Sequence, residues 1–396
     1  MENQNISPKI EKKLKRKQFD LFDAGYACVC FIILQLVCSF LILLFRKEIA
    51  SHASLYFIAQ FVVEAVFICA SLIVSASRDV EFVKATTYNK KFSWKTALLA
   101  VAISVICMIG FSSLTNVFVY SLQKLGYNSS LSSFNISNFG TYLLYVFLIC
   151  IVPAVFEETL FRATILNGMR EKGKHYAVLM SALIFMLMHG GPDQTIHQFI
   201  LGVILGYVFV YTGSIWVTVL IHFLNNFYSV TMLYILNSSS SGAETVEELP
   251  SWGSLATTLV VGIAIACVAS YLIYLCIVGM KKVRESDEKK QHKKFVALLE
   301  KDVLTEEDIA WLKKYEANKD EYENYEKAEK LRNELKLKKM ANIVENQRDS
   351  EQIKEESESD ALNVKKPNAG YIVMLTLSLI YLCASWILTL ISGFLG

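Results

Sequence analysis

The chain has 396 residues, of which 54% are apolar, and its mean hydropathy of +0.38 excludes an ordinary soluble domain of this length. Its formal net charge of +2 conceals an uneven distribution, because residues 281–366 alone hold 21 Lys or Arg and 22 Asp or Glu. The composition therefore predicts a polytopic membrane protein with one strongly charged segment in water.

Apolar segments of roughly membrane-crossing length, about 20 residues, recur along the chain. They predict an all-α bundle of about nine spans, of which the fifth is short, at 22–45, 53–77, 96–121, 141–166, 176–189, 195–212, 214–236, 253–280 and 370–395. Basic clusters fall in alternate loops, at Lys9–Lys17, Lys84–Lys95, Arg170–Lys174 and Lys281–Arg284. By the positive-inside rule, the N-terminus and the 281–366 segment are expected in the cytosol.

These segments divide the chain into six parts: a basic cytosolic N-terminus (1–21), N-terminal spans (22–139), a central block (140–236), an external loop with the eighth span (237–280), a charged cytosolic insert (281–369) and a final span (370–396). In the insert, Thr305 and Asp308 predict a helix-capping box. Beyond it, the dense charge favours a solvated helix running into disorder, or an arm that binds a partner.

Isolated polar residues and cysteines in the spans have ordinary structural interpretations. All nine cysteines lie in apolar segments without metal-ligand spacing, so they are interpreted as small core residues. Glu64 in the second span has no evident partner at helical spacing, and a structural hydrogen bond or a cavity-facing position is favoured over a catalytic role.

The central block carries ionisable residues at membrane depth, which are functional candidates by default. Glu157 and Glu158 are adjacent, so on a helix they point about 100° apart, and Arg162 lies four residues after Glu158 on the same face. We therefore expect Arg162 to pair with Glu158 and to leave Glu157 free to face a cleft.

Three more polar residues follow in the next apolar segments: His189, His222 and Asn226. Glu157 and His189 lie about 15 and 16 residues from the turn at 171–174, so both are expected roughly 23 Å from it. His222 and Asn226 share a helix face, about 14 and 20 Å from the turn at 212–213. Asn226 is therefore expected to be the more nearly level with Glu157.

Such a set of residues suits hydrolysis. A carboxylate in a low-dielectric site can take a proton from water, and a neutral histidine can hold that water. A second histidine and an amide can donate hydrogen bonds to an oxyanion. Three alternatives stay open at this point: a zinc site, although Asn is a poor ligand and no His-Glu-x-x-His signature is present; interhelical hydrogen bonds alone; and a proton-coupled transporter.

In these residues the chain resembles the CAAX-protease and bacteriocin-processing family (CPBP, also called Abi), which is related to the type II CAAX prenyl endopeptidases. The resemblance covers about residues 140–230 and rests on Glu157-Glu158-x-x-x-Arg162, Phe185-x-x-x-His189 and His222-x-x-x-Asn226. It implies a helical bundle with a water-filled cavity, in which Glu157 activates water with His189 while His222 and Asn226 stabilise the oxyanion. Glu158, Arg162 and Phe185 are then supporting residues, and no metal or other cofactor is required.

We therefore expect a multi-pass protein of a bacterial plasma membrane that cleaves a peptide bond by glutamate-activated water. Its partners would be the lipid bilayer and a membrane-associated peptide or protein substrate, with no nucleic acid. The insert at 281–366 adds a candidate surface for a cytosolic protein partner. The alternative function is a non-proteolytic scaffold or regulator of cell-envelope enzymes or signalling proteins.

Overall fold

The computed structural model describes residues 18–90, 92–128, 136, 138–239, 249–299, 305, 307–308, 310–312 and 369–395. The basic stretch Lys9–Lys17 and the charged arm expected beyond residue 312 lie outside these residues. The chain forms two compact units, one made of Met1–Lys281 with Asn368–Gly396 and the other of Lys282–Pro367.

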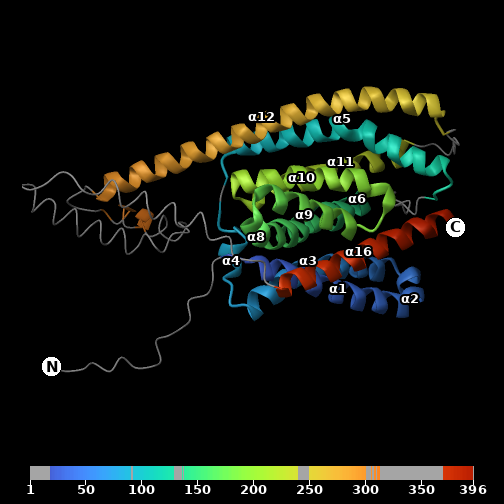
Figure 1. The fold of residues 1–396 in the computed structure, drawn as a ribbon, viewed down its shortest axis with the longest axis horizontal. Coiled ribbons are helices and arrows are strands. Elements are labelled where there is room, and N and C mark those ends of the chain that lie inside the picture. The colour runs from blue at the N-terminus through green and yellow to red at the C-terminus, as the bar shows by residue number, and fades with distance from the viewer. Residues whose placement is uncertain are drawn as a thin grey trace, which may run out of the picture. The chain divides into compact units, whose positions relative to one another are not determined.

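Helices make up all the regular elements among the described residues (Figure 1). The first are α1 (Leu21–Leu44), α2 (Arg46–Ser51), α3 (Ala53–Ser77), α4 (Phe82–Ala85) and α5 (Trp94–Lys124). One long helical stretch then contains α6 (Phe139–Tyr145), η1 (Val146–Ile151), α7 (Val152–Glu158), η2 (Thr159–Leu166), α8 (Asn167–Met169) and η3 (Arg170–Lys172). After it come α9 (Lys174–Met188), η4 (Pro192–Gln194), α10 (Thr195–Thr212), α11 (Ile215–Ser239), α12 (Trp252–Leu299) and α16 (Ala369–Leu395).

Within the described residues, eight helical stretches are long and apolar enough to cross a membrane, and α9 is a ninth, shorter apolar helix. The prediction of an all-α membrane bundle of about nine spans, with a short fifth, is confirmed. Turn chemistry follows the sequence: Gly213 adopts a left-handed conformation with φ of 64° between α10 and α11, where a side chain would be strained.

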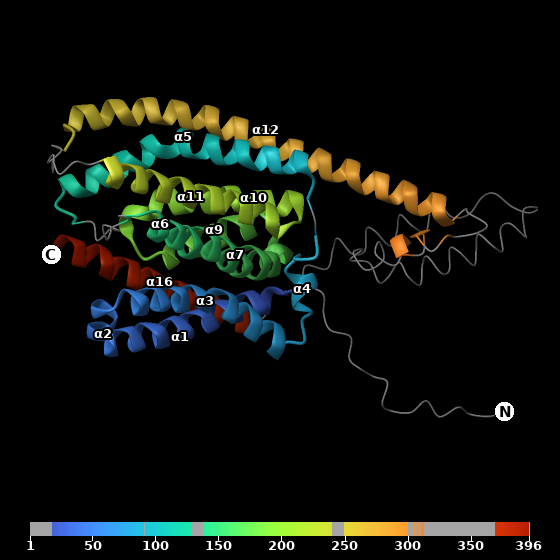
Figure 2. The same ribbon diagram turned by 180° about the vertical axis from the view of Figure 1, so that it is seen from behind.

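The helices of the first unit pack in the same order in both views (Figures 1 and 2). Helices α7, α9, α10 and α11 form the centre, where α9 lies against α10 and α7 lies against α11. On one side α3 contacts α7, and α1 contacts both α3 and α16; on the other side α5 contacts α10 and α11. The central block is therefore enclosed by helices from both ends of the chain.

The final span, α16, is joined to the central block by polar contacts as well as apolar packing. Trp386 donates its indole N–H to Thr195 Oγ1 at 3.0 Å, at the start of α10. Tyr176 of α9 and Tyr371 of α16 are hydrogen-bonded through their hydroxyls at 3.0 Å. In this way the last helix braces both helices of the α9–α10 hairpin.

Small residues let α5 and α12 approach closely within the first unit. A Cβ added to Gly110 would overlap the Cβ of Ala269, and one added to Gly262 would come within 2.9 Å of the Ser113 Cβ. Close approach through Gly, Ala and Ser is the usual basis of helix packing in a bilayer, where apolar burial gives little net attraction.

We expect Gly110→Ala to destabilise the bundle by about 1–3 kcal/mol, the usual cost of overpacking. The double variant Gly110→Ala/Ala269→Gly moves the methyl group from one helix to the other and should recover most of that loss. Thermal unfolding in one detergent, followed for the two variants and the parent protein, tests this. An unchanged unfolding temperature in Gly110→Ala would contradict the close contact.

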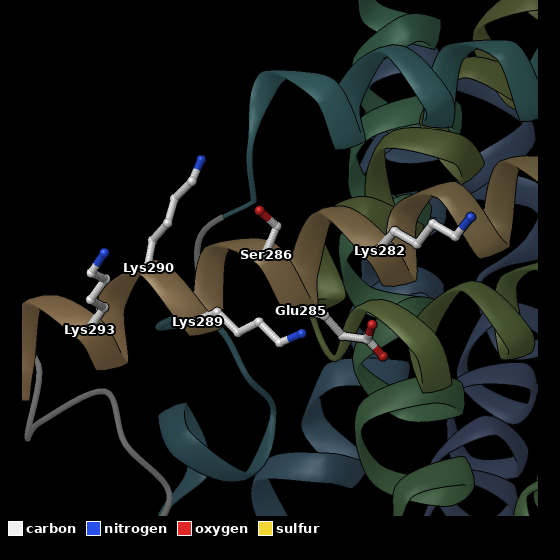
Figure 3. A pocket seen from close by; sticks show the side chains of 6 residues that line it. All are labelled: Lys282, Glu285, Ser286, Lys289, Lys290 and Lys293. Atoms are coloured by element: carbon white, nitrogen blue, oxygen red, sulfur yellow. The ribbon is translucent and has the colours of Figure 1, made fainter.

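In the second unit, the continuation of α12 carries a basic face. Lys282, Lys289, Lys290 and Lys293 lie with Glu285 and Ser286 around one hollow (Figure 3). The predicted capping box is confirmed, since the backbone N–H of Thr305 donates to Asp308 Oδ2 and that of Asp308 donates to Thr305 Oγ1, both at 3.2 Å. A partner for this insert stays a prediction.

Candidate active site

The two adjacent glutamates end α7, between two π-helical segments. η1 precedes α7 and η2 follows it, and Arg162 lies within η2. Glu157 is 5% exposed and Glu158 is fully buried. π-helical turns are rare and are frequent at functional sites, because the extra residue in the turn changes the direction in which side chains point.

η2 is anchored from outside by the loop before α5. The hydroxyls of Tyr88 and Thr159 are hydrogen-bonded, and Thr164 donates to Ser71 Oγ of α3 at 3.0 Å. Burial raises the pKa of Tyr88, so its hydroxyl stays a neutral partner. The wide turns that hold Arg162 are therefore fixed by neighbours on two sides.

Arg162, Glu158 and His222 form a buried charged network. Arg162 Nη1 lies 2.9 Å from Glu158 Oε1, as the i,i+4 spacing predicted. The same carboxylate oxygen lies 3.0 Å from Nδ1 of His222, on α11. Because an ionised carboxylate only accepts, Nδ1 of His222 carries the hydrogen. Glu158 thus pairs with the arginine and also fixes the orientation of the His222 imidazole.

Phe185 and Gly202 also contact the guanidinium. Its central carbon lies 4.4 Å from the centre of the Phe185 ring, a cation–π distance, and Nη2 donates to the Gly202 carbonyl at 3.4 Å. A Cβ on Gly202 would lie only 3.0 Å from Ala182 of α9, so this glycine allows α9 and α10 to pack closely. The long stretch that contains α7 and η2, together with α9 and α10, therefore meets at one buried cation.

His189 follows α9 directly, one turn after Phe185. Its Nδ1 lies 2.8 Å from the Phe185 carbonyl oxygen, and because a carbonyl only accepts, Nδ1 is the protonated nitrogen. The Phe185 ring also contacts both imidazoles edge-on, at centroid distances of 4.6 Å to His189 and 5.9 Å to His222. Phe185 therefore sets the orientation of both histidines.

Both imidazoles turn their Nε2 atoms toward one oxygen of Glu157. The distance to Glu157 Oε2 is 4.0 Å from His189 and 3.9 Å from His222, too long for a direct hydrogen bond. Among the described residues, Oε2 has no hydrogen-bond partner. The two carboxylates therefore have the different surroundings that the sequence predicted: Glu158 is paired with Arg162, and Glu157 faces two histidines.

One predicted depth is wrong. His222, and not Asn226, is level with Glu157, while Asn226 Nδ2 donates at 3.0 Å to the carbonyl of Ile149, which lies in η1. The count assumed 1.5 Å of rise for every residue, but η2 separates Glu157 from the turn. A π-helical segment rises less per residue, so Glu157 lies somewhat closer to the turn than the count implied, but eight such residues cannot shorten roughly 23 Å to the roughly 14 Å expected for His222, and η2 accounts for only part of the difference.

Two residues that no sequence motif indicated, His197 and Asn225, join this group. Asn225 Nδ2 lies 3.1 Å from His197 Nε2 and 3.4 Å from Asn226 Oδ1. A second correction concerns Glu64, which does have a partner at helical spacing, because Gln60 Nε2 lies 3.5 Å from its Oε1. An amide four residues before a lone acid was the signal available for this pair.

The residues give no clear metal site. Among the described residues, no group of three or more His, Cys, Asp or Glu side chains is arranged to hold a metal ion. All nine cysteines are free thiols, dispersed over six helices. The polar groups that do converge are one free carboxylate and two imidazoles, each imidazole fixed by a hydrogen bond at Nδ1.

Fold and site together define a multi-pass membrane protein with a buried glutamate–histidine centre. The model of one protein family, described as type II CAAX prenyl endopeptidase Rce1-like, matches residues 139–228, which contain every motif residue named above. The resemblance predicted from the motifs is confirmed over this region. Helices α1, α3, α5, α12 and α16 lie outside the match. No curated protein and no solved structure matches the chain.

We expect Arg162→Met to destabilise the protein strongly, because it leaves the Glu158 carboxylate buried without its cation. Breaking a buried ion pair from one side costs about 3–5 kcal/mol. The double variant Arg162→Met/Glu158→Gln removes both charges and should recover part of this loss. Thermal unfolding of the purified variants measures both effects, and a single variant as stable as the parent would contradict the role of the pair.

Proposed function

We propose that this protein is an intramembrane endopeptidase that hydrolyses a peptide bond in a membrane-associated peptide or protein. The observation that carries the proposal is the approach of two imidazole Nε2 atoms to within 4.0 Å of the one Glu157 oxygen. The match to an endopeptidase family over residues 139–228 supports it. In this proposal Glu157 is the general base and the cytoplasmic, or plasma, membrane of a bacterium is the location.

The two distances of about 4 Å fit a bridging water. A water oxygen about 2.8 Å from both Glu157 Oε2 and an imidazole nitrogen subtends an angle of about 90° between them, within the range that water accepts. His189 Nε2 is an acceptor in the neutral ring, because the hydrogen is on Nδ1. His189 can therefore orient a water while Glu157 removes one of its protons.

The reaction then balances without a covalent enzyme intermediate. The water oxygen bonds to the peptide carbonyl carbon, its proton moves to Glu157, and the carbonyl oxygen becomes an oxyanion. When the tetrahedral intermediate collapses, the carbon–nitrogen bond breaks and the amine takes the proton from Glu157. The products are one new carboxyl terminus and one new amino terminus, and the glutamate is regenerated.

His222 and Asn226 are the proposed donors to the oxyanion. His222 donates from Nε2 only when both ring nitrogens carry hydrogen, and the Glu158 carboxylate on Nδ1 supports that charged ring. Asn226 uses one N–H for the Ile149 carbonyl and keeps the second for a ligand.

We expect Glu157→Gln to abolish cleavage while leaving the fold intact, because the amide is isosteric but cannot take the proton. A general base contributes about 10²–10⁴-fold to rate, so loss of at least about 10²-fold is predicted. The measurement is a mass-spectrometric comparison of membrane and secreted peptides from cells with the wild-type protein, Glu157→Gln, or a deletion. At equal protein abundance, Glu157→Gln should leave the same peptides uncut as the deletion does.

Two controls sharpen this comparison. His175→Leu alters an exposed histidine on α9 that bonds Tyr207, so it should match the wild type. If Glu157→Gln matches the wild type while the deletion changes the cell, proteolysis is the wrong function. The non-proteolytic scaffold then takes its place, and charge substitutions in the 281–366 insert are the variants to compare next.

A further inference from the structure

One polar pair beside the site lies outside the three motifs. His197 is in the first turn of α10, and Asn225 precedes Asn226 on α11. Asn225 is 5% exposed, and its Nδ2 lies 3.1 Å from His197 Nε2. The mechanism above uses neither residue. Burying an amide costs free energy unless its hydrogen bonds are satisfied, so the partners of the Asn225 amide determine whether it is stable here.

The donors and acceptors allow one consistent direction. An amide nitrogen only donates, so His197 Nε2 is an acceptor and its ring hydrogen is on Nδ1. The second N–H of Asn225 points to Asn226 Oδ1 at 3.4 Å, and Asn226 Nδ2 donates to the Ile149 carbonyl at 3.0 Å. Turning the Asn225 amide over would set its oxygen against the Asn226 oxygen, two acceptors facing each other.

A continuous chain of hydrogen bonds therefore runs from α10 through α11 to the π-helical segment η1. Both atoms of the Asn226 amide are engaged, the oxygen by Asn225 and the nitrogen by Ile149. Two such contacts fix the plane of the amide and hence the direction of its remaining N–H. Asn226 is one helical turn after His222, on the same face of α11.

We infer that His197 is a positioning residue, which acts through Asn225 to hold the Asn226 amide in the orientation that stabilises the oxyanion. This inference rests on the proposed endopeptidase function. His197 itself is well placed for such a role, because Thr195 in the same turn of α10 is bonded to Trp386 of α16. Misplacement of an oxyanion donor by about 1 Å can reduce rate by about 10²-fold.

The test compares two substitutions at His197 that differ in one property. His197→Gln offers an amide oxygen that can accept from Asn225, whereas His197→Leu fills the space without an acceptor. The full-length protein in proteoliposomes is assayed with a farnesylated peptide ending in cysteine, two aliphatic residues and a final residue. We expect kcat to fall about 10- to 100-fold in His197→Leu, with KM within about twofold. In His197→Gln, kcat should stay within about threefold of wild type.

A matched control and a spectroscopic measurement complete the design. His175→Leu removes a histidine from the same α9–α10 hairpin, away from the site, and should leave kcat unchanged. NMR of the ¹⁵N-labelled Asn226 side chain should show a shift of its amide resonance in His197→Leu but little change in His197→Gln. This second readout needs no substrate.

Each outcome decides a different claim. If the wild type cleaves the peptide, Glu157→Gln does not, and the two His197 variants are equally active or equally impaired, the positioning role is overturned while the protease stands. An Asn226 amide resonance that is the same in His197→Leu and wild type also overturns it. If the wild type cleaves no faster than Glu157→Gln, the proposed hydrolysis of this peptide class fails, and the NMR comparison alone reports on the His197–Asn225 pair.

Discussion

The buried ion pair between Arg162 and Glu158 is the interaction on which the rest of the structure depends. Both side chains are fully buried, and charges removed from water are costly unless their geometry is fully matched. The pair is surrounded by the Phe185 ring of α9, the Gly202 carbonyl of α10 and His222 of α11, while Arg162 Nε and Glu158 Oε2 have no hydrogen-bond partner among the described residues. The pair therefore links η2 to residues of α9, α10 and α11.

The same interaction separates the two adjacent carboxylates into different roles. Glu158 is committed to Arg162 and His222, which leaves Glu157 as the carboxylate that faces the two Nε2 atoms. Around this centre, hydrogen bonds to Phe185 and Glu158 fix the two rings, and the His197–Asn225 pair fixes the neighbouring amide. Helices outside the family match contact the helices that carry the site, and α16 does so through the hydrogen bond from Trp386 to Thr195.

Much of this could be predicted from the sequence, because the relevant signals are local. Apolar segment length predicted the spans, and the four-residue spacing predicted the Arg162–Glu158 pair. The π-helical segments have no comparable signal, and counting residues at a uniform rise misplaced Glu157 relative to His222. The contact between His197 and Asn225 depends on how α10 packs against α11, which helix periodicity within each segment does not determine. The Gln60–Glu64 pair was local and could have been found.

The most direct test of this account compares Glu157→Gln with Glu158→Gln in a single experiment. Each purified protein, reconstituted in the same lipid, is measured for thermal unfolding and for cleavage of a peptide that cells carrying the deletion leave uncut. The account predicts that Glu157→Gln unfolds at or above the wild-type temperature and is inactive, because its carboxylate works in catalysis and not in folding. Glu158→Gln should unfold at a clearly lower temperature, because Arg162 loses its counter-charge. The account would be contradicted if Glu157→Gln cleaved the peptide at the wild-type rate, or if Glu158→Gln were as stable as the wild type.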